Sequence, residues 1–226
     1  MAVIHHTTLT PTKTELLAAW LPSRPWYRGG DGAPRLIRAG GFRLDDPAGE
    51  VGVEFVIVRD TSGAGPVVYL APLTYRGAPL EGAEHALVGT LEHGVLGRRW
   101  VYDACHDPVF AAQLPALIEG RVLAQAQSVS DTPDDDVLRA YRGTGPLAAD
   151  FGSAGVTDHR DRTELTAGDG SVLRVRRVLS PGAGPGSGAP AGAAGDAGEV
   201  EASWEQPDGG RERGVLVTVR TAPPAS

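Results

Sequence analysis

Short apolar segments separated by turn signals fill the first half of this chain, and they limit the folds that it can adopt. Five such segments, rich in β-branched and aromatic residues, lie at 35–44, 51–59, 67–75, 86–91 and 96–102. The sequences DTSG at 60–63 and RG at 76–77 are typical of turns between strands. Because parallel strands need crossover connections of about a dozen residues or more, this spacing predicts an antiparallel meander.

A helix is expected before the first of these strands. Thr12 and Glu15 form a capping-box pattern, in which the threonine oxygen accepts from an amide three residues on and the glutamate reaches back to the cap. The apolar residues that follow fall on one helical face: Leu16, Leu17, Trp20 and Leu21. Pro22 and Pro25 are expected to end this helix.

Two further helices are expected after the meander. Asp107 and Pro108 form an N-cap followed by proline at the first helical position, and the residues up to 118 present an apolar face. Pro115 is expected to kink this second helix or to split it. A third helix is expected from 132 to 143, because its first turn holds acidic residues at 134–136 and Gly143 follows its end.

The C-terminal part of the chain predicts a small antiparallel β-element. Residues 144–171 are polar and glycine-rich. Residues 180–198 consist mainly of Gly, Ala and Pro, so we expect a disordered loop at 180–198. Alternating segments at 173–176 and 200–219 flank that loop. The second of them contains a turn sequence, PDGG, and therefore predicts a hairpin.

Composition excludes several classes of protein. The 226 residues suffice for one large domain or two small ones, and 21 Lys and Arg against 28 Asp and Glu give a net charge of −7, which argues against nucleic-acid binding. The single cysteine, Cys105, cannot form a disulfide within the chain, which favours a cytoplasmic protein. The N-terminal sequence lacks the pattern of a signal peptide, and no apolar run approaches the ~20 residues of a membrane span.

No catalytic, cofactor-binding or metal-binding residue is expected. The sequence HRD at 159–161 matches the kinase catalytic loop in letters, but Thr166 stands where that loop has its magnesium-binding asparagine. The chain contains no G-x-x-x-x-G-K or G-x-G-x-x-G sequence, and the letters DFG occur at 150–152, before HRD and not after it, so 159–161 predicts a solvated polar loop. Cys105 and His106, with His85 and His93 as distant partners, lack the spacing of a zinc site, so a buried cysteine beside a surface histidine is expected.

Aromatic residues supply the only candidate contact surface. Trp20 and Trp204 fall on faces expected to be core. The segment around Arg24, Trp26, Tyr27 and Arg28 combines basic and aromatic residues without helical or strand periodicity, and Trp100 is a further candidate for a ligand or partner contact. One interpretation is a loop packed across the sheet edge, and the other is a partner contact.

This segment also carries a resemblance to a known family. Residues 16–29, LLAAWLPSRPWYRG, resemble the W-L-x-x-x-R-W-Y-x-G opening of actinobacterial maltokinases, which phosphorylate maltose in the trehalose-to-α-glucan route. Segments 53–59 and 67–75 look like paired strands of the family's cap, and 100–118 is similar to its Y-D-A…F-L-x-x-L-I segment. The resemblance spans about 12–123 and implies an N-terminal cap, a cystatin-like curved antiparallel sheet wrapped against a helix.

The parts of the family that bind nucleotide, magnesium and sugar have no counterpart in this sequence. Residues 172–178 are similar to the I-L-K-V-F-R-R strand of a kinase N-lobe, but the nucleotide-pairing lysine is missing and the single lysine, Lys13, lies in the first helix. Since the sequence ends at Ser226, we expect a standalone cap without the catalytic lobe. The resemblance therefore implies a fold and a metabolic neighbourhood, with no catalytic residue and no cofactor.

Together these observations predict an α+β protein with a cap-like domain at 1–125, a helical connector at 126–150 and a small antiparallel β-element at 151–226. The leading hypothesis is a non-catalytic cap-like protein that contacts a sugar kinase or another enzyme of α-glucan and trehalose metabolism through the Arg24–Arg28 loop and one sheet face. The alternatives are a small-molecule or sugar-binding module on the concave sheet and a degenerate sugar kinase. Membrane partners are not expected, and the ligand, the partner and the oligomeric state stay open.

Overall fold

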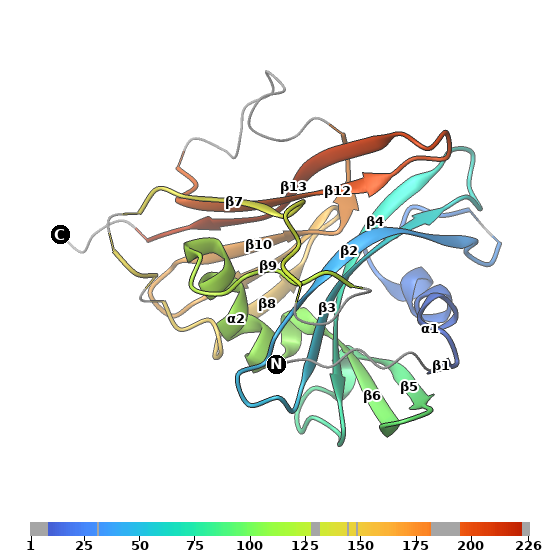
Figure 1. Ribbon diagram of the computed structural model, residues 1–226, viewed down its shortest axis with the longest axis horizontal. Coiled ribbons are helices and arrows are strands. Elements are labelled where there is room, and N and C mark those ends of the chain that lie inside the picture. Colours follow the sequence, from blue (N-terminus) through green and yellow to red (C-terminus); the bar gives the residue numbers. More distant parts are fainter. Residues whose placement is uncertain are drawn as a thin grey trace.

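Two antiparallel sheets form most of the protein (Figure 1). The computed structural model describes residues 9–30, 32–127, 132–143, 145–147, 149–181 and 195–222. The first sheet has the order β1-β5-β6-β4-β3-β2, and its strands are β1 (Leu9–Thr10), β2 (Leu36–Leu44), β3 (Gly52–Asp60), β4 (Val67–Arg76), β5 (Leu87–His93) and β6 (Gly97–Asp103). The short β11 (Val178–Leu179) also pairs with β4.

The second sheet is built from the C-terminal part of the chain. Its order is β7-β12-β13-β10-β9-β8, with β7 (Leu138–Tyr141), β8 (Gly155–Asp158), β9 (Arg162–Thr166), β10 (Val172–Arg176), β12 (Gly198–Glu205) and β13 (Arg211–Arg220). The predicted hairpin over 200–219 is confirmed, and the Gln206 amide donates to the Gly210 carbonyl at 2.8 Å to close its turn. The C-terminal element is therefore larger than the small one expected.

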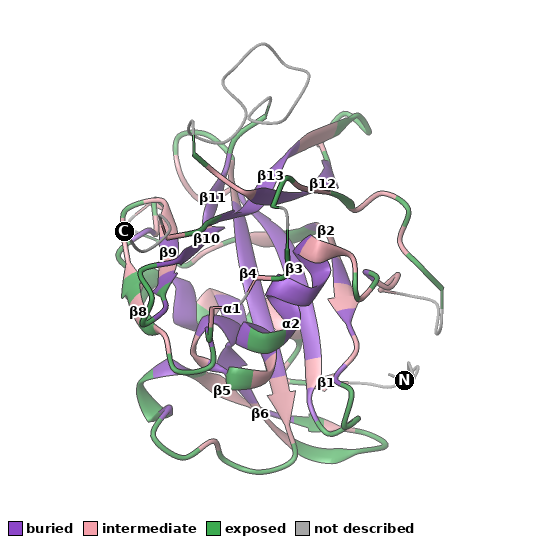
Figure 2. Ribbon diagram, turned by 90° about the vertical axis from the view of Figure 1, so that its left-hand side faces the viewer, coloured by how far each residue is buried: buried purple, intermediate pink, exposed green. Residues whose placement is uncertain are grey.

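The five strands predicted for the meander are all present in the first sheet and pair antiparallel, but β6 lies beside β4 and β5 lies beyond β6, so their order is not that of a simple meander. The protein consists mostly of antiparallel sheet with few helices, and the cystatin-like α+β assignment stays a prediction. Figure 2 shows that β3 and β4 are buried along most of their lengths. These two strands therefore form the centre of the molecule.

A β-bulge in β2 bends the edge of the first sheet. The pairing of β2 with β3 shifts register between Arg38 and Gly40. Gly41 has φ of 130°, and a Cβ at this position would collide with the carbonyl oxygen of Phe55. The glycine is thus required for the curvature of the sheet. Ser203 on β12 lies directly against Gly40, so the bend also brings the second sheet close.

Helix α1 (Lys13–Trp20) confirms the predicted capping box. Thr12 accepts from the Glu15 amide at 3.3 Å, and the Glu15 carboxylate accepts from the Thr12 amide at 2.7 Å. A 3-10 turn, η1 (Leu21–Ser23), continues from the helix at Pro22. The apolar side chains of α1 pack on one face of the first sheet, against Val56, Val58, Ala71 and Leu73.

Helix α2 (Pro108–Glu119) begins at the predicted N-cap, where the Asp107 carboxylate accepts from the Val109 amide at 2.9 Å. Pro115 lies inside one uninterrupted helix, so the expected split is wrong. The helix ends at Gly120, which adopts φ of 76°. Two further 3-10 turns precede this helix in the chain: η2 (Glu84–Ala86) lies before β5, and η3 (Ala104–His106) lies between β6 and α2.

The two sheets share one hydrophobic core. Residues of the first sheet, of α2 and of the second sheet belong to a single cluster, which includes Phe42, Phe55, Phe110, Leu173, Trp204 and Val217. The rings of Phe42 and Phe55 stack at 4.2 Å between centroids. The predicted boundaries at 125 and 150 remain predictions, and the sheets on either side of them pack together.

The predicted helix over 132–143 is wrong, and so the described part of the expected helical connector contains a strand instead. Residues 138–141 form β7, which pairs with β12. The reason lies in Asp136, whose carboxylate accepts from the Ser203 amide and hydroxyl, both at 2.9 Å, and from Arg213 at 2.6 Å. These contacts with β12 and β13 fix the segment on the sheet and outweigh its local helical preference.

Two other expectations concern the loops. Residues 144–171, described from the sequence only as polar and glycine-rich, contribute β8 and β9. Of the loop expected to be disordered at 180–198, residues 182–194 lie outside the described part of the chain, and β12 begins at Gly198. The N-terminal residues 1–8 also lie outside it.

A buried ion pair joins the second sheet to the first. Arg177 lies between β10 and β11, is 0% exposed, and donates to both carboxylate oxygens of Asp103 at 2.7 Å. Its Nε donates to the Thr163 hydroxyl at 2.7 Å, and its guanidinium lies 5.1 Å from the ring centroid of Trp26. One side chain from the C-terminal part therefore connects β6, β9 and the segment after α1.

Candidate functional site

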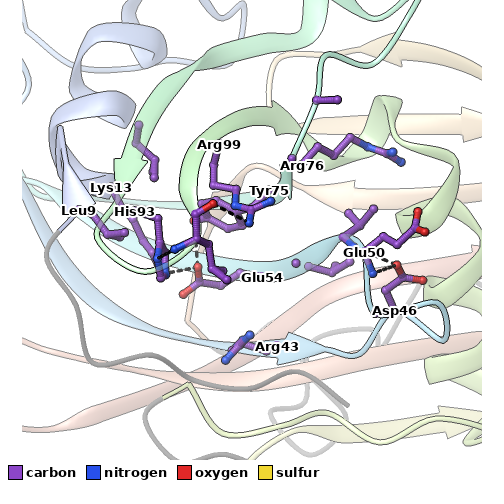
Figure 3. A pocket seen from close by; sticks show the side chains of 18 of the residues that line it. Leu9, Lys13, Arg43, Asp46, Glu50, Glu54, Tyr75, Arg76, His93 and Arg99 are labelled. Carbon is purple, nitrogen blue, oxygen red and sulfur yellow. Dashed lines mark hydrogen bonds and ion pairs between the residues drawn. The ribbon is translucent and has the colours of Figure 1, made fainter.

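A cavity of about 780 Å³ lies on the face of the first sheet that carries α1 (Figure 3). Helix α1 has only eight residues, so it covers part of this face and leaves the ends of β2, β3 and β4 open beside its first residue, Lys13. The cavity is lined mainly by polar side chains from these elements and from β5 and β6, among them Lys13, Arg43, Asp46, Glu50, Glu54, Tyr75, Arg76, His93, Arg99 and Gln127.

Glu54 lies at the centre of this cavity and is only 4% exposed. Three side chains donate to its carboxylate: Lys13 at 2.5 Å, Tyr75 at 2.9 Å and Gln127 at 3.0 Å. Arg38 lies 3.9 Å away. Because side chains alternate along a strand, Glu54 lies on the same side of β3 as Val56 and Val58. Its carboxylate therefore lies on the face of the first sheet that carries α1, in the part that α1 leaves uncovered.

Burial alone would raise the pKa of Glu54, but the charges of Lys13 and Arg38 and the hydrogen bonds outweigh it, and the pKa lies below its usual value. Burial and the nearby Glu54 charge raise the pKa of Tyr75 well above its usual value. The tyrosine therefore stays protonated and the glutamate stays ionised. Because both oxygens of Glu54 already accept hydrogen bonds, the carboxylate is a fixed structural anion and a poor general base.

Two other charged residues of the cavity have structural partners. The Asp46 carboxylate accepts from the amides of Ala48, Glu50 and Val51 at 2.9 to 3.1 Å and so closes the turn between β2 and β3. Arg76 donates to both oxygens of Asp107 at 2.7 Å, which ties β4 to the start of α2. Neither residue needs a ligand to satisfy its charge.

Comparison with known protein families finds a match that covers most of the first sheet. Residues 20–107 match the family described as the maltokinase N-terminal cap domain. This part of the chain is therefore similar to a maltokinase N-terminal cap domain. The match runs from the end of α1 to η3, within the 12–123 over which the sequence resembles that family. No curated protein matches the chain.

The predicted contact residues lie in two separate clusters. Trp26 and Tyr27 lie beside Tyr69, with ring centroids 5.9 and 5.8 Å from it. Trp100 is half-buried on β6 and packs with Tyr102 in another cluster. None of the five predicted contact residues lines the cavity.

Trp26 is not on the surface. Its side chain is 0% exposed and lies between Trp20, Tyr69 and Arg177. Its burial favours, for this ring, the interpretation of a loop packed across the sheet, and the partner contact stays a prediction for the segment. One of the surrounding side chains, Arg177, lies far along the chain and gives no local sequence signal.

The other residues of the segment reach the surface. Arg28 is exposed, Arg24 and Tyr27 are half-buried, and the Arg24 guanidinium lies 5.1 Å from the Trp20 ring centroid. The Tyr27 hydroxyl donates to Asp60 at 3.0 Å, and the Arg28 amide donates to the Tyr69 hydroxyl at 2.8 Å. The segment is thus a loop fixed across the sheet, with basic groups at its surface.

The remaining motifs behave as structural elements. Residues 159–161 form the turn between β8 and β9, which is closed by a hydrogen bond from the His159 amide to the Arg162 carbonyl at 2.8 Å.

Cys105 is buried and free, as expected, and burial raises the pKa of its thiol. His85 and His106, which are 21 residues apart in the sequence, lie 3.1 Å apart between Nε2 and Nδ1. Within the described residues, no group of three or more His, Cys, Asp or Glu could hold a metal ion.

The cavity itself was missed by the sequence interpretation. One local signal was available: Glu54 interrupts an otherwise apolar run from Val51 to Val58, and a charge within a buried strand indicates a specific partner. The partners Lys13 and Gln127 lie 41 and 73 residues away, so no spacing rule could identify them.

Proposed function

We propose that this protein is a non-catalytic, cytoplasmic accessory of maltose, trehalose and α-glucan metabolism that acts by associating with a sugar kinase or another enzyme of that metabolism. The match of residues 20–107 to the maltokinase cap domain carries this proposal. The absence of phosphate-binding sequence motifs supports the non-catalytic part. The chain's single lysine is bound to Glu54, so it is not available to pair with nucleotide phosphates.

The loop that follows α1 supplies the contact surface in this proposal. Arg24 and Arg28 present positive charge in a chain whose net charge is −7, so they form a local patch that an acidic surface would recognise. The bonds of Tyr27 to Asp60 and of the Arg28 amide to Tyr69 hold the loop in place before binding. A preorganised loop loses little conformational entropy on association.

Size-exclusion chromatography with a purified maltose-phosphorylating kinase tests this proposal. We expect the unmodified protein to co-elute with the kinase and the R24E/R28E variant to elute separately. The variant R139E/R220E is a matched control, because it reverses two exposed arginines of the second sheet that form no ion pair within the described residues. Separate elution of the unmodified protein, or equal loss of co-elution in both variants, would contradict the proposal.

Binding of a small molecule or sugar is a second candidate function, and the cavity over Glu54 favours it. Its volume of about 780 Å³ lies within the range of about 300 to 1,000 Å³ that is usual for ligand sites. The half-buried ring of Tyr75 offers an apolar surface among polar groups. Calorimetric titration with maltose, trehalose and glucosamine tests this candidate, and heat of binding in the absence of any partner protein is the result that supports it.

A further inference from the structure

Several charged residues of the cavity over Glu54 have no ion-pair partner among the described residues. Glu54 is neutralised by Lys13 and Arg38, and Arg76 is neutralised by Asp107. The Asp46 carboxylate is occupied by three backbone amides. The charged residues of the cavity lining without an ion pair among the described residues are then Arg43, Arg99, the exposed Glu50, and Asp46, whose carboxylate keeps its charge although the amides hold it in place.

Arg43 and Arg99 form no ion pair with any described residue. Arg43 is half-buried on β2 directly opposite Glu54 in the strand pairing. Arg99 is half-buried on β6, where its Nη2 donates to the Leu96 carbonyl at 3.0 Å while its Nε is buried without a partner among the described residues. Each guanidinium therefore retains donors that could bind an anion.

The two arginines lie on opposite sides of Glu54 and border the same cavity (Figure 3). They come from strands separated by β3 and β4, so the sheet fixes their positions. Guanidinium groups bind carboxylate and phosphate oxygens through paired, charge-assisted hydrogen bonds. The Glu54 carboxylate repels such a ligand only weakly, since Lys13 and Arg38 neutralise it.

We propose that the cavity over Glu54 binds a small organic anion whose carboxylate or phosphate group is held by Arg43 and Arg99. This inference rests on the second candidate function, small-molecule binding, and it specifies the chemical class of the ligand. Arg43 and Arg99 hold the anionic group, and the Tyr75 ring packs against the rest of the ligand.

Isothermal titration calorimetry of the full chain tests the proposal with four probes: malonate, inorganic phosphate, glucose 6-phosphate and neutral maltose. We expect an anion to bind and its affinity to fall as salt is added, because salt screens the arginine charges. Arg43→Gln should weaken binding by about tenfold or more, the effect of losing hydrogen bonds to a charged group, and Arg43→Lys should restore part of it. Arg98→Gln is the matched control, since Arg98 is exposed and does not line the cavity.

The probes separate the possible outcomes. Binding of malonate alone identifies a carboxylate ligand, binding of the two phosphate compounds identifies a phosphate ligand, and either result supports the proposal if Arg43→Gln weakens it. Anion binding that is equal in the wild type and Arg43→Gln overturns the proposal. Binding of maltose without any anion overturns it while leaving the second candidate function intact, and absence of all binding contradicts both.

Discussion

Replacing Arg177 with methionine should destabilise the whole protein. The substitution leaves Asp103, which is 2% exposed, without the two 2.7 Å bonds that compensate its charge. Breaking a buried ion pair by removing one partner costs about 3–5 kcal/mol, and loss of the contact with the Trp26 ring adds about 0.5–2 kcal/mol. Because a domain has only about 5–15 kcal/mol of stability, this change removes a large part of it.

Urea unfolding followed by tryptophan fluorescence measures this loss, and Trp26 is a local reporter because it contacts Arg177. Arg176→Met is the matched control, since the neighbouring side chain is half-buried and forms no ion pair within the described residues. A double-mutant cycle with Asp103→Asn should give a coupling energy of about 2 kcal/mol or more. A loss below about 1 kcal/mol, equal to that of Arg176→Met, would refute the conclusion that this pair joins the two sheets.

Three further predictions concern stability. Trp20→Ala should cost about 3–5 kcal/mol in urea unfolding, because the ring is buried against Trp26; a cost below about 1 kcal/mol would place it outside the core. The folded pKa of Glu54 lies below its unfolded value, so its stabilising contribution is present above about pH 4.3 and is lost as the pH falls through the folded pKa. Unfolding of Glu54→Gln should therefore depend less steeply on pH in that acidic range, and an unchanged slope would count against the network. Burial, and to a smaller extent the charge of His85, lowers the pKa of His106, so protonation opposes folding and stability should fall as the pH drops below about 6.5; His106→Gln should reduce that fall, and identical melting curves at pH 7 and 5.5 in both proteins would disprove it.

The strands and caps could be predicted because their signals are local. Thr12 with Glu15 and Asp107 with Pro108 fix two helix starts within four residues of sequence, and both are present. The alternation and the turns between 35 and 102 likewise predicted the strands of the first sheet. Such patterns depend on the backbone and on near neighbours, which the sequence displays directly.

The errors arose where distant residues decide the structure. Segment 132–143 has a helical start signal, but Asp136 bonds to Ser203, 67 positions away, and the segment becomes a strand. For Trp26 the sequence left a packed loop and a partner contact open, and the ring is buried among Trp20, Tyr69 and Arg177, the last of them from the C-terminal part. The cavity depends in the same way on contacts of Glu54 that span 41 to 73 positions. A single sequence gives no direct sign of such pairs.

None of the described helices has the length and apolarity required to cross a bilayer.

The functional proposal depends on association with a kinase through the cap-like part of the chain. ATP-dependent phosphorylation of maltose, measured for the protein alone, for a maltose-phosphorylating kinase alone and for their mixture, tests it most directly. We predict no transfer by the protein alone above a heat-inactivated sample and a saturable change of kinase turnover in the mixture. Phosphoryl transfer by the isolated protein, or turnover in the mixture identical to that of the kinase alone, would contradict the account.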